Sequence, residues 1–230
     1  MTMDIYGNAL LDFHKTGKAD VLWLHNSYDE PEEMPIEVFF RGEDDMPEIE
    51  LKALGLCKGN VLDVGAGVGS HALLLDKKGV DVTAIDISST AVAIMQERGV
   101  KKPLLQDFFS ITEKYDTLLF MMNGIGLTGT LQGFENFLET AKNILNKNGQ
   151  LLFDSSDISY LYDDMPMPEN QYFGEISYCY EYKNQKGNWF NWLYIDPTTL
   201  QRLSKQHGWN CKIIYHDDND QYLAQLTAAH

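Results

Sequence analysis

A glycine-rich segment holds the residues whose spacing points most directly to chemistry. Residues 61–69 read Val-Leu-Asp-Val-Gly-Ala-Gly-Val-Gly. Glycines at alternate positions after an apolar run let a ligand approach the backbone closely, and a helix starting at Ser70 would add free N–H groups. A dinucleotide loop would have a third glycine at position 70. The loop therefore predicts a binding turn whose ligand must be identified from its neighbours.

Three carboxylates near the loop indicate which chemical groups that ligand carries. Asp63 lies two residues before the first glycine, where it would repel a pyrophosphate and attract an ammonium group. Asp86 ends the next apolar run and can accept hydrogen bonds from both hydroxyls of a ribose. Asp107 can accept one from an adenine amino group while Phe108 packs on the ring. A cationic amino-acid end, a ribose and an adenine together describe S-adenosylmethionine.

Each of these residues also has a purely structural interpretation. The glycines could form a bare strand-to-helix turn. Asp86 could cap a helix that starts near Ser88, and Asp107 could be an acid of a surface loop. The conjunction of all three at fitting spacings favours the cofactor site.

Three further side chains could act at such a site. His71 and Asp157 are candidate bases, although His71 could equally be a histidine that packs on its helix. Arg41, in Phe-Phe-Arg, could pair with the carboxylate of the cofactor or with a nearby acid such as Glu43.

Alternating strands and helices must position these residues. Apolar runs predict strands over 60–64, 81–86, 116–122 and 150–154, and helices over 70–78, 88–98 and 131–145, the last ended by Asn148-Gly149. This alternation predicts a parallel sheet covered by helices on both faces, with ligands beyond the carboxyl ends of the strands. Those ends carry Gly65 to Gly69, Asp86, Asp107, Asn123 and Asp154.

The last third of the chain changes character. Residues 172–195 contain nine aromatic side chains. Aromatic residues alternate along 178–182 and again along 190–194, which predicts a β-hairpin that turns near Gly187-Asn188. A helix is expected from Asp196-Pro197 to Gly208, followed by strands over 211–215 and 221–226.

With these motifs the sequence resembles the class I S-adenosylmethionine-dependent methyltransferases. Residues 61–69, 84–88 and 106–108 resemble the family's cofactor motifs, and 115–120 and 145–153 its fourth and fifth strands. The resemblance implies an α/β Rossmann-like fold: a mostly parallel seven-stranded sheet with helices on both faces, an N-terminal cap and an aromatic hairpin insertion. It implies one domain over 1–230, divided into a cap (1–57), a cofactor half (58–154) and an acceptor half (155–230). The implied cofactor-binding residues are Asp63, Gly65, Ala66, Gly67, Gly69, Asp86, Ile87, Asp107, Phe108, Asn123 and Arg41.

The segment after the fourth strand narrows the acceptor. The family's adenine and glutamine methyltransferases usually have Asn/Asp-Pro-Pro-Tyr/Phe there, whereas this chain has Asn123-Gly-Ile-Gly. No cysteine stands there for cytosine methylation. Catechol-type enzymes hold a metal between an acid that ends strand four and an Asp-Asn pair after strand five. This chain has Asn123 and Asp154-Ser155 at those places, so no metal is expected. A small-molecule acceptor methylated at O, N or C remains. We expect the hairpin and residues 39–41 to wall its pocket, although the hairpin could instead extend the sheet or form a dimer surface.

Three rival functions stay open. A non-catalytic S-adenosylmethionine-binding module would keep the same loop, and a nicotinamide oxidoreductase would need it to hold a dinucleotide. The Asp-Ser-Ser-Asp sequence at 154–157 resembles an aminopropyltransferase motif, although it follows a different strand.

Composition limits the partners. The 230 residues include 18 basic and 34 acidic side chains, for a net charge of −16, which repels nucleic acids and anionic membranes. No run approaches the ~20 apolar residues of a membrane helix, and the amino terminus does not resemble a secretory signal. Three isolated cysteines match neither a zinc site nor a disulfide framework. We therefore expect a cytoplasmic protein, either a monomer or a homodimer.

Overall fold

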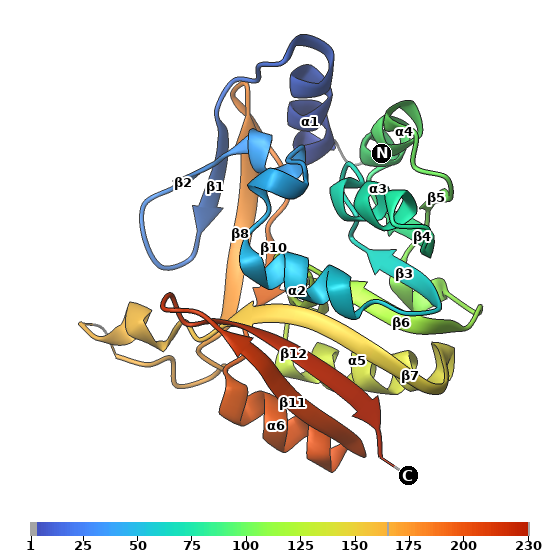
Figure 1. Ribbon diagram of the computed structural model, residues 1–230. Coiled ribbons are helices and arrows are strands. Elements are labelled where there is room, and N and C mark those ends of the chain that lie inside the picture. Colours follow the sequence, from blue (N-terminus) through green and yellow to red (C-terminus); the bar gives the residue numbers. More distant parts are fainter. Residues whose placement is uncertain (1–3, 165, 230) are drawn as a thin grey trace.

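A computed structural model describes residues 4–164 and 166–229, and a seven-stranded sheet forms its centre (Figure 1). The strand order is β11-β12-β7-β6-β3-β4-β5. Most of the sheet consists of parallel strands, namely β3 (Asn60–Val64), β4 (Asp81–Asp86), β5 (Pro103–Leu105), β6 (Tyr115–Phe120) and β7 (Leu145–Ser156). β12 (Gln221–Ala228) runs antiparallel between β7 and β11 (Trp209–His216). The predicted mostly parallel sheet is confirmed, and its order reverses between β3 and β6, where α/β sheets bind ligands.

Helices cover both faces of this sheet because its central strands are apolar on both sides. α5 (Leu131–Ile144) and α6 (Pro197–Gln206) pack on one face, around Phe120, Phe137 and Phe153. α2 (Glu48–Leu56), α3 (Ser70–Lys77) and α4 (Ser89–Arg98) pack on the other, around Leu119 and Leu152. Ser88 caps α4, since its hydroxyl accepts the N–H of Ala91 at 3.0 Å.

The predicted end of α5 at Asn148-Gly149 is wrong. The helix ends at Ile144, and the buried Leu145 already pairs with Tyr115 of β6. The strand register then jumps, so that Gln150 pairs with Thr117. Asn148, whose φ is +66°, therefore lies in an irregular stretch of β7 instead of a helix cap.

A second, antiparallel sheet joins the aromatic hairpin to the cap. Its order is β10-β8-β1-β2, with β9 beside β8. The hairpin contributes β8 (Glu175–Tyr182), β9 (Gln185–Lys186) and β10 (Phe190–Leu193). The cap contributes β1 (Leu22–Asn26) and β2 (Glu32–Met34), which the sequence did not reveal. The hairpin turns at Lys183 and Asn184, both with positive φ, and not at 187–188.

The rest of the cap lies against the cofactor half. It comprises α1 (Ile5–Thr16), the short 3-10 helices η1 (Ile36–Phe39) and η2 (Glu43–Asp45), and α2. Ile5 and Leu10 of α1 share one apolar cluster with Val68 of the glycine loop and Ile94 of α4. This cluster holds the start of the chain over the carboxyl ends of the strands. No helix in the described ranges is long and apolar enough to cross a membrane.

Candidate functional site

The glycine loop is held in place by Asp86. The N–H of Gly67 donates to Asp86 Oδ2 at 2.9 Å, and the N–H of Ser88 donates to Oδ1 at 2.8 Å. Gly65, Gly67 and Gly69 all have φ between +55° and +81°, which other residues adopt only with strain. Each carboxylate oxygen of Asp86 keeps a second lone pair. The turn is therefore preformed, and Asp86 can still accept two hydroxyl donors.

Asp63 lies at the end of β3 with an unsatisfied oxygen. Its side chain is 1% exposed, and within the described part of the chain no hydrogen-bond donor reaches Oδ2. Burial raises the pKa of this carboxyl to about 6. A buried acceptor without a donor is costly, so this atom fits a cationic, N–H-bearing ligand group such as the ammonium of an amino acid.

The adenine side of the site differs from the prediction at Phe108. Its ring is 3% exposed and lies 5.2 Å from the rings of Phe120 and Phe137 in the core. The prediction that this ring packs on an adenine is therefore wrong. Asp107 uses Oδ1 to accept the N–H of Phe109 at 3.0 Å. Ile87 is 79% exposed directly after Asp86, which offers an apolar surface for a base.

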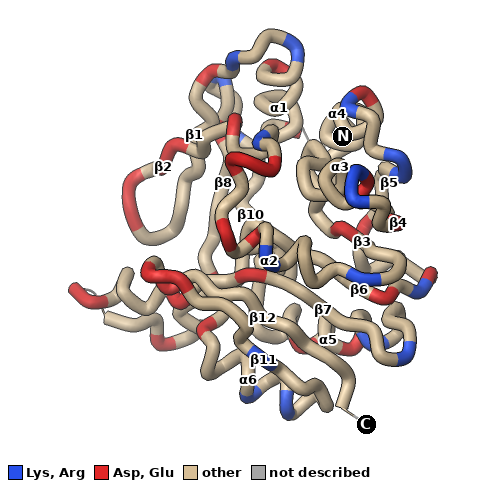
Figure 2. The backbone as a smooth tube through the Cα atoms, in the orientation of Figure 1, with Lys and Arg blue, Asp and Glu red and all other residues tan. Residues whose placement is uncertain are grey.

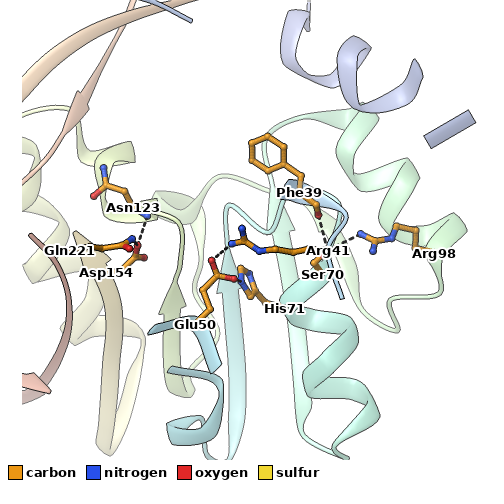
Figure 3. A network of polar contacts seen from close by, with 9 residues as sticks. All are labelled: Phe39, Arg41, Glu50, Ser70, His71, Arg98, Asn123, Asp154 and Gln221. Atoms are coloured by element: carbon orange, nitrogen blue, oxygen red, sulfur yellow. Dashed lines mark hydrogen bonds and ion pairs between the residues drawn. The ribbon is translucent and has the colours of Figure 1, made fainter. Parts of the chain in front are cut away.

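A buried ionic network connects the cap to α3 (Figure 3). Glu50 of α2 accepts from Arg41 through one oxygen, and its other oxygen lies 2.8 Å from Nε2 of His71. All three side chains are largely buried. Arg41 thus pairs with neither Glu43 nor an exposed acid. His71 is therefore a buried, hydrogen-bonded histidine, and its burial lowers its pKa.

A second polar group lies where β6, β7 and β12 come together (Figure 3). Asp154 Oδ2 accepts the N–H of Asn123 at 2.9 Å and Nε2 of Gln221 at 2.8 Å. Met122 and Asn123 both have positive φ, and such strain persists where the surroundings enforce it. Asp154 Oδ1 and Asn123 Oδ1 are buried and have no partner among residues 4–164 and 166–229. Burial raises the pKa of Asp154 to about 6.

Asp157 does not join this group. Its carboxylate accepts the N–H of Ser159 at 2.9 Å and so shapes its own loop. Asp154 is the acid that accepts from both Asn123 and Gln221, whereas the sequence analysis expected chemistry at this strand end but chose Asp157 as the candidate base. No sequence pattern pointed to Gln221, because its partner Asp154 lies 67 residues away and the two meet only through the fold.

An aromatic wall faces these strand ends from the cap and the second sheet. We define it as Tyr6, Phe39, Tyr178, Tyr180, Phe190, Trp192 and Tyr194. Tyr6 stacks on Tyr180 at 5.6 Å and meets Phe39 edge-on at 5.2 Å. The Tyr6 hydroxyl is 3.3 Å from where a Cβ on Gly67 would lie, and Trp192 fills the corresponding space at Gly126. The wall therefore reaches from the glycine loop to η4 (Gly124–Thr128).

The residues at the strand ends fit S-adenosylmethionine. The unsatisfied Asp63 oxygen suits its ammonium group, Asp86 its ribose and the exposed Ile87 its adenine. The glycine loop leaves open space where a side chain on Gly65 would project. The chemistry of this set of donors and acceptors thus agrees with the cofactor that the sequence predicted.

Comparisons with known proteins agree with this site. A family model described as a methyltransferase domain matches residues 46–212. A solved S-adenosylmethionine-dependent methyltransferase from Bacteroides fragilis, in complex with S-adenosyl-L-homocysteine, is 37% identical. The match covers 100% of this chain and 98% of that one, with a TM-score of 0.92. A methyltransferase structure from Clostridium acetobutylicum shares the fold at 14% identity, with a TM-score of 0.59 over 81% of this chain and 94% of that one.

A curated relative from Bacillus subtilis, YqeM, has a provisional methyltransferase name and is 26% identical over 134 residues. The match covers 54% of this chain and 53% of YqeM, so it spans about half the length of that relative. The family model and the Bacteroides structure both cover far more than half of this chain. The chain therefore belongs to the methyltransferase domain family, as an S-adenosylmethionine-dependent methyltransferase of class I.

Proposed function

We propose that this chain transfers a methyl group from S-adenosylmethionine to a small molecule bound between the aromatic wall and the ends of β3, β6 and β7. The observation that carries the proposal is the position of Tyr6. Its hydroxyl lies beside the glycine loop, 3.3 Å from where a Cβ on Gly67 would lie, and its ring stacks on Tyr180 of the hairpin. Cofactor loop and aromatic wall thus border the same space. That arrangement supports an enclosed site suited to a small acceptor.

The chain's own residues would bind, orient and exclude water. Asp63, Asp86 and the glycine loop would hold the cofactor, which supplies an electrophilic methyl group on a sulfonium. The wall would desolvate and align the acceptor. Such alignment accelerates the direct transfer of a methyl group, for which no side chain has to form a covalent intermediate. Glu50 would anchor the cap to α3 through its contact with His71, and Arg41 would hold the Glu50 carboxylate in place through their ion pair.

Methyl labelling of a cell extract tests this proposal. The protein is incubated with methyl-labelled S-adenosylmethionine and a bacterial extract, which is then separated into small molecules, RNA, DNA and protein. We expect label in the small-molecule fraction, and its loss with Asp63→Asn but not with Asp157→Asn. Label confined to RNA, DNA or protein would contradict the proposal, as would no transfer by a protein that binds the cofactor.

A further inference from the structure

We propose that the acceptor is an amine whose nitrogen is bound by Asp154 Oδ1 and Asn123 Oδ1 in front of the aromatic wall. This inference rests on the proposed function and names its class of substrate. Three observations carry it: two buried acceptors that find no donor in the described part of the chain, a wall of aromatic rings, and the distribution of charge around both.

The unsatisfied atoms are both hydrogen-bond acceptors. Asp154 already receives two donors on Oδ2, and no described residue donates to its Oδ1. The orientation of the Asn123 amide is set by Leu193, because Nδ2 donates to the Leu193 carbonyl at 3.3 Å. Its Oδ1 is therefore left over as an acceptor. A primary amine or its ammonium form offers two or more N–H donors to such a pair, a hydroxyl offers one, and a carboxylate offers none.

The wall suits a group with positive charge. The faces of Tyr and Trp rings attract ammonium ions, most strongly where water is excluded. The Tyr178 hydroxyl donates to that of Tyr194 at 3.3 Å. The Tyr28 hydroxyl donates to Glu32 at 2.7 Å. Burial, and then the carboxylates of Glu32 and Asp154 among other groups, raise the pKa of Tyr194. Acids from two elements, Glu32 on β2 and Asp154 on β7, thus act on this tyrosine of the wall.

The charges that face Asp154 also favour a cation. Arg41 and His71 act on it from the cap and α3, but Glu50 pairs with both of them. Gln221 on β12 contributes a neutral amide. The chain carries a net charge of −16. Figure 2 shows acidic residues gathered along the loop before β2 and at the turn between β11 and β12. Such a field attracts cations toward the site.

In methyl transfer to an amine, Asp154 can take the proton that the nitrogen loses, and the cofactor sulfur keeps the electron pair of the bond that breaks. The acceptor nitrogen first loses a proton, which Asp154 can take and pass to water. The free electron pair of nitrogen then forms the new N–C bond. The S–C bond breaks, and its electron pair stays on sulfur, which becomes the neutral thioether. The methylated nitrogen carries the positive charge that sulfur gave up.

Matched probes test the inference on the whole chain saturated with S-adenosyl-L-homocysteine. Benzylamine, benzyl alcohol and benzoate share one ring and differ in the group that would meet Asp154. We expect benzylamine to bind roughly tenfold or more tightly than the other two, the scale of hydrogen bonds to a charged group. Asp154→Asn should abolish that preference and leave binding of S-adenosyl-L-homocysteine unchanged. Asp157→Asn, three residues along the chain, is the control and should keep the preference.

The outcomes separate two failures. If benzyl alcohol or benzoate binds as tightly as benzylamine, or if benzylamine fails to bind the saturated protein, the inference is wrong and the proposed function stands. A preference for benzylamine that survives in Asp154→Asn also contradicts it. If S-adenosyl-L-homocysteine itself does not bind, the proposed function fails. The comparison of probes on the unaltered chain needs no variant, so it decides even if Asp154→Asn does not fold.

Discussion

Two buried carboxylates give the site its character at the scale of single residues. Asp63 and Asp154 are at most 1% exposed, and each has an oxygen to which no residue in 4–164 or 166–229 donates. Burial raises the pKa of both to about 6. In the free protein at neutral pH each therefore carries a charge that its surroundings do not fully compensate. Such a cost is expected where a ligand later supplies the missing donors.

Asp63→Asn should separate stability from function. Since the folded pKa is raised from 3.8 to about 6, protonation favours the folded state at low pH. That contribution is lost as pH rises through about 4 to 6, and above pH 6 the ionised carboxylate costs on the order of 3 kcal/mol. We expect Asp63→Asn to melt at a higher temperature than the wild type at pH 7.5 and to gain little at pH 4. Its affinity for S-adenosyl-L-homocysteine should fall tenfold or more.

Thermal unfolding and calorimetric titration at the two pH values check this expectation. A variant that melts lower at pH 7.5 while binding the ligand normally would show that Asp63 serves the fold and not the cofactor.

At the scale of elements, the structure joins segments that the sequence shows only separately. The glycine loop, the strand ends and the hairpin could be predicted because each depends on local periodicity and turn residues. The pairing of His25 in β1 with Cys179 in β8 could not, because it joins residues 154 positions apart. Neither could the position of Tyr6, which comes beside Tyr180 and Gly67 only through the fold.

The misplaced hairpin turn has a similar physical cause. Gly187-Asn188 is a strong turn signal, but its glycine N–H donates to the Tyr180 carbonyl at 2.8 Å, within the strand pairing. The reversal falls on Lys183 and Asn184, of which Asn adopts positive φ more readily than most residues. The prediction for Phe108 was wrong because a position next to Asp107 in the sequence does not fix which way a side chain points. Its ring packs on Phe120 and Phe137 in the core.

Trp192 tests the role of the hairpin element. It packs on Gly126, away from the glycine loop, so Trp192→Ala should leave affinity for S-adenosyl-L-homocysteine unchanged. The KM for an accepted amine should rise tenfold or more, because the acceptor loses an aromatic surface. Steady-state kinetics and calorimetry give the two quantities. Trp189→Ala is the matched control, since this tryptophan of the same hairpin is 58% exposed.

An unchanged KM in Trp192→Ala would remove the hairpin from the acceptor site. A loss of cofactor affinity equal to the rise in KM would make Trp192 a general structural residue instead.

At the scale of the whole molecule, the start of the chain covers its own cofactor loop. α1 packs against α4 and Val68, the Ser88 hydroxyl donates to Asp4 at 2.5 Å, and Arg98 donates to the carbonyls of Val68 and Phe40. We therefore expect the cap to open for the ligand to enter and to close once the ligand is bound.

Hydrogen exchange should report this closure. A ligand that binds only the closed form stabilises it against opening. We expect S-adenosyl-L-homocysteine to slow exchange in residues 5–16 and 65–75 and to leave residues 197–206 in α6 unchanged. Mass spectrometry of peptides with and without the ligand measures this directly. Equal slowing in all three segments would indicate global stabilisation, and no slowing in 5–16 would contradict a closing cap.

The most direct test of the central claim is a calorimetric titration of the protein with S-adenosyl-L-homocysteine and with NADH. We predict saturable binding of the first and none of the second. Asp86→Ala should weaken binding by about 1.5–3 kcal/mol, the scale of hydrogen bonds to a charged group. Asp81→Ala, at the other, exposed end of β4, should not. Tight binding of NADH without binding of S-adenosyl-L-homocysteine would contradict the account.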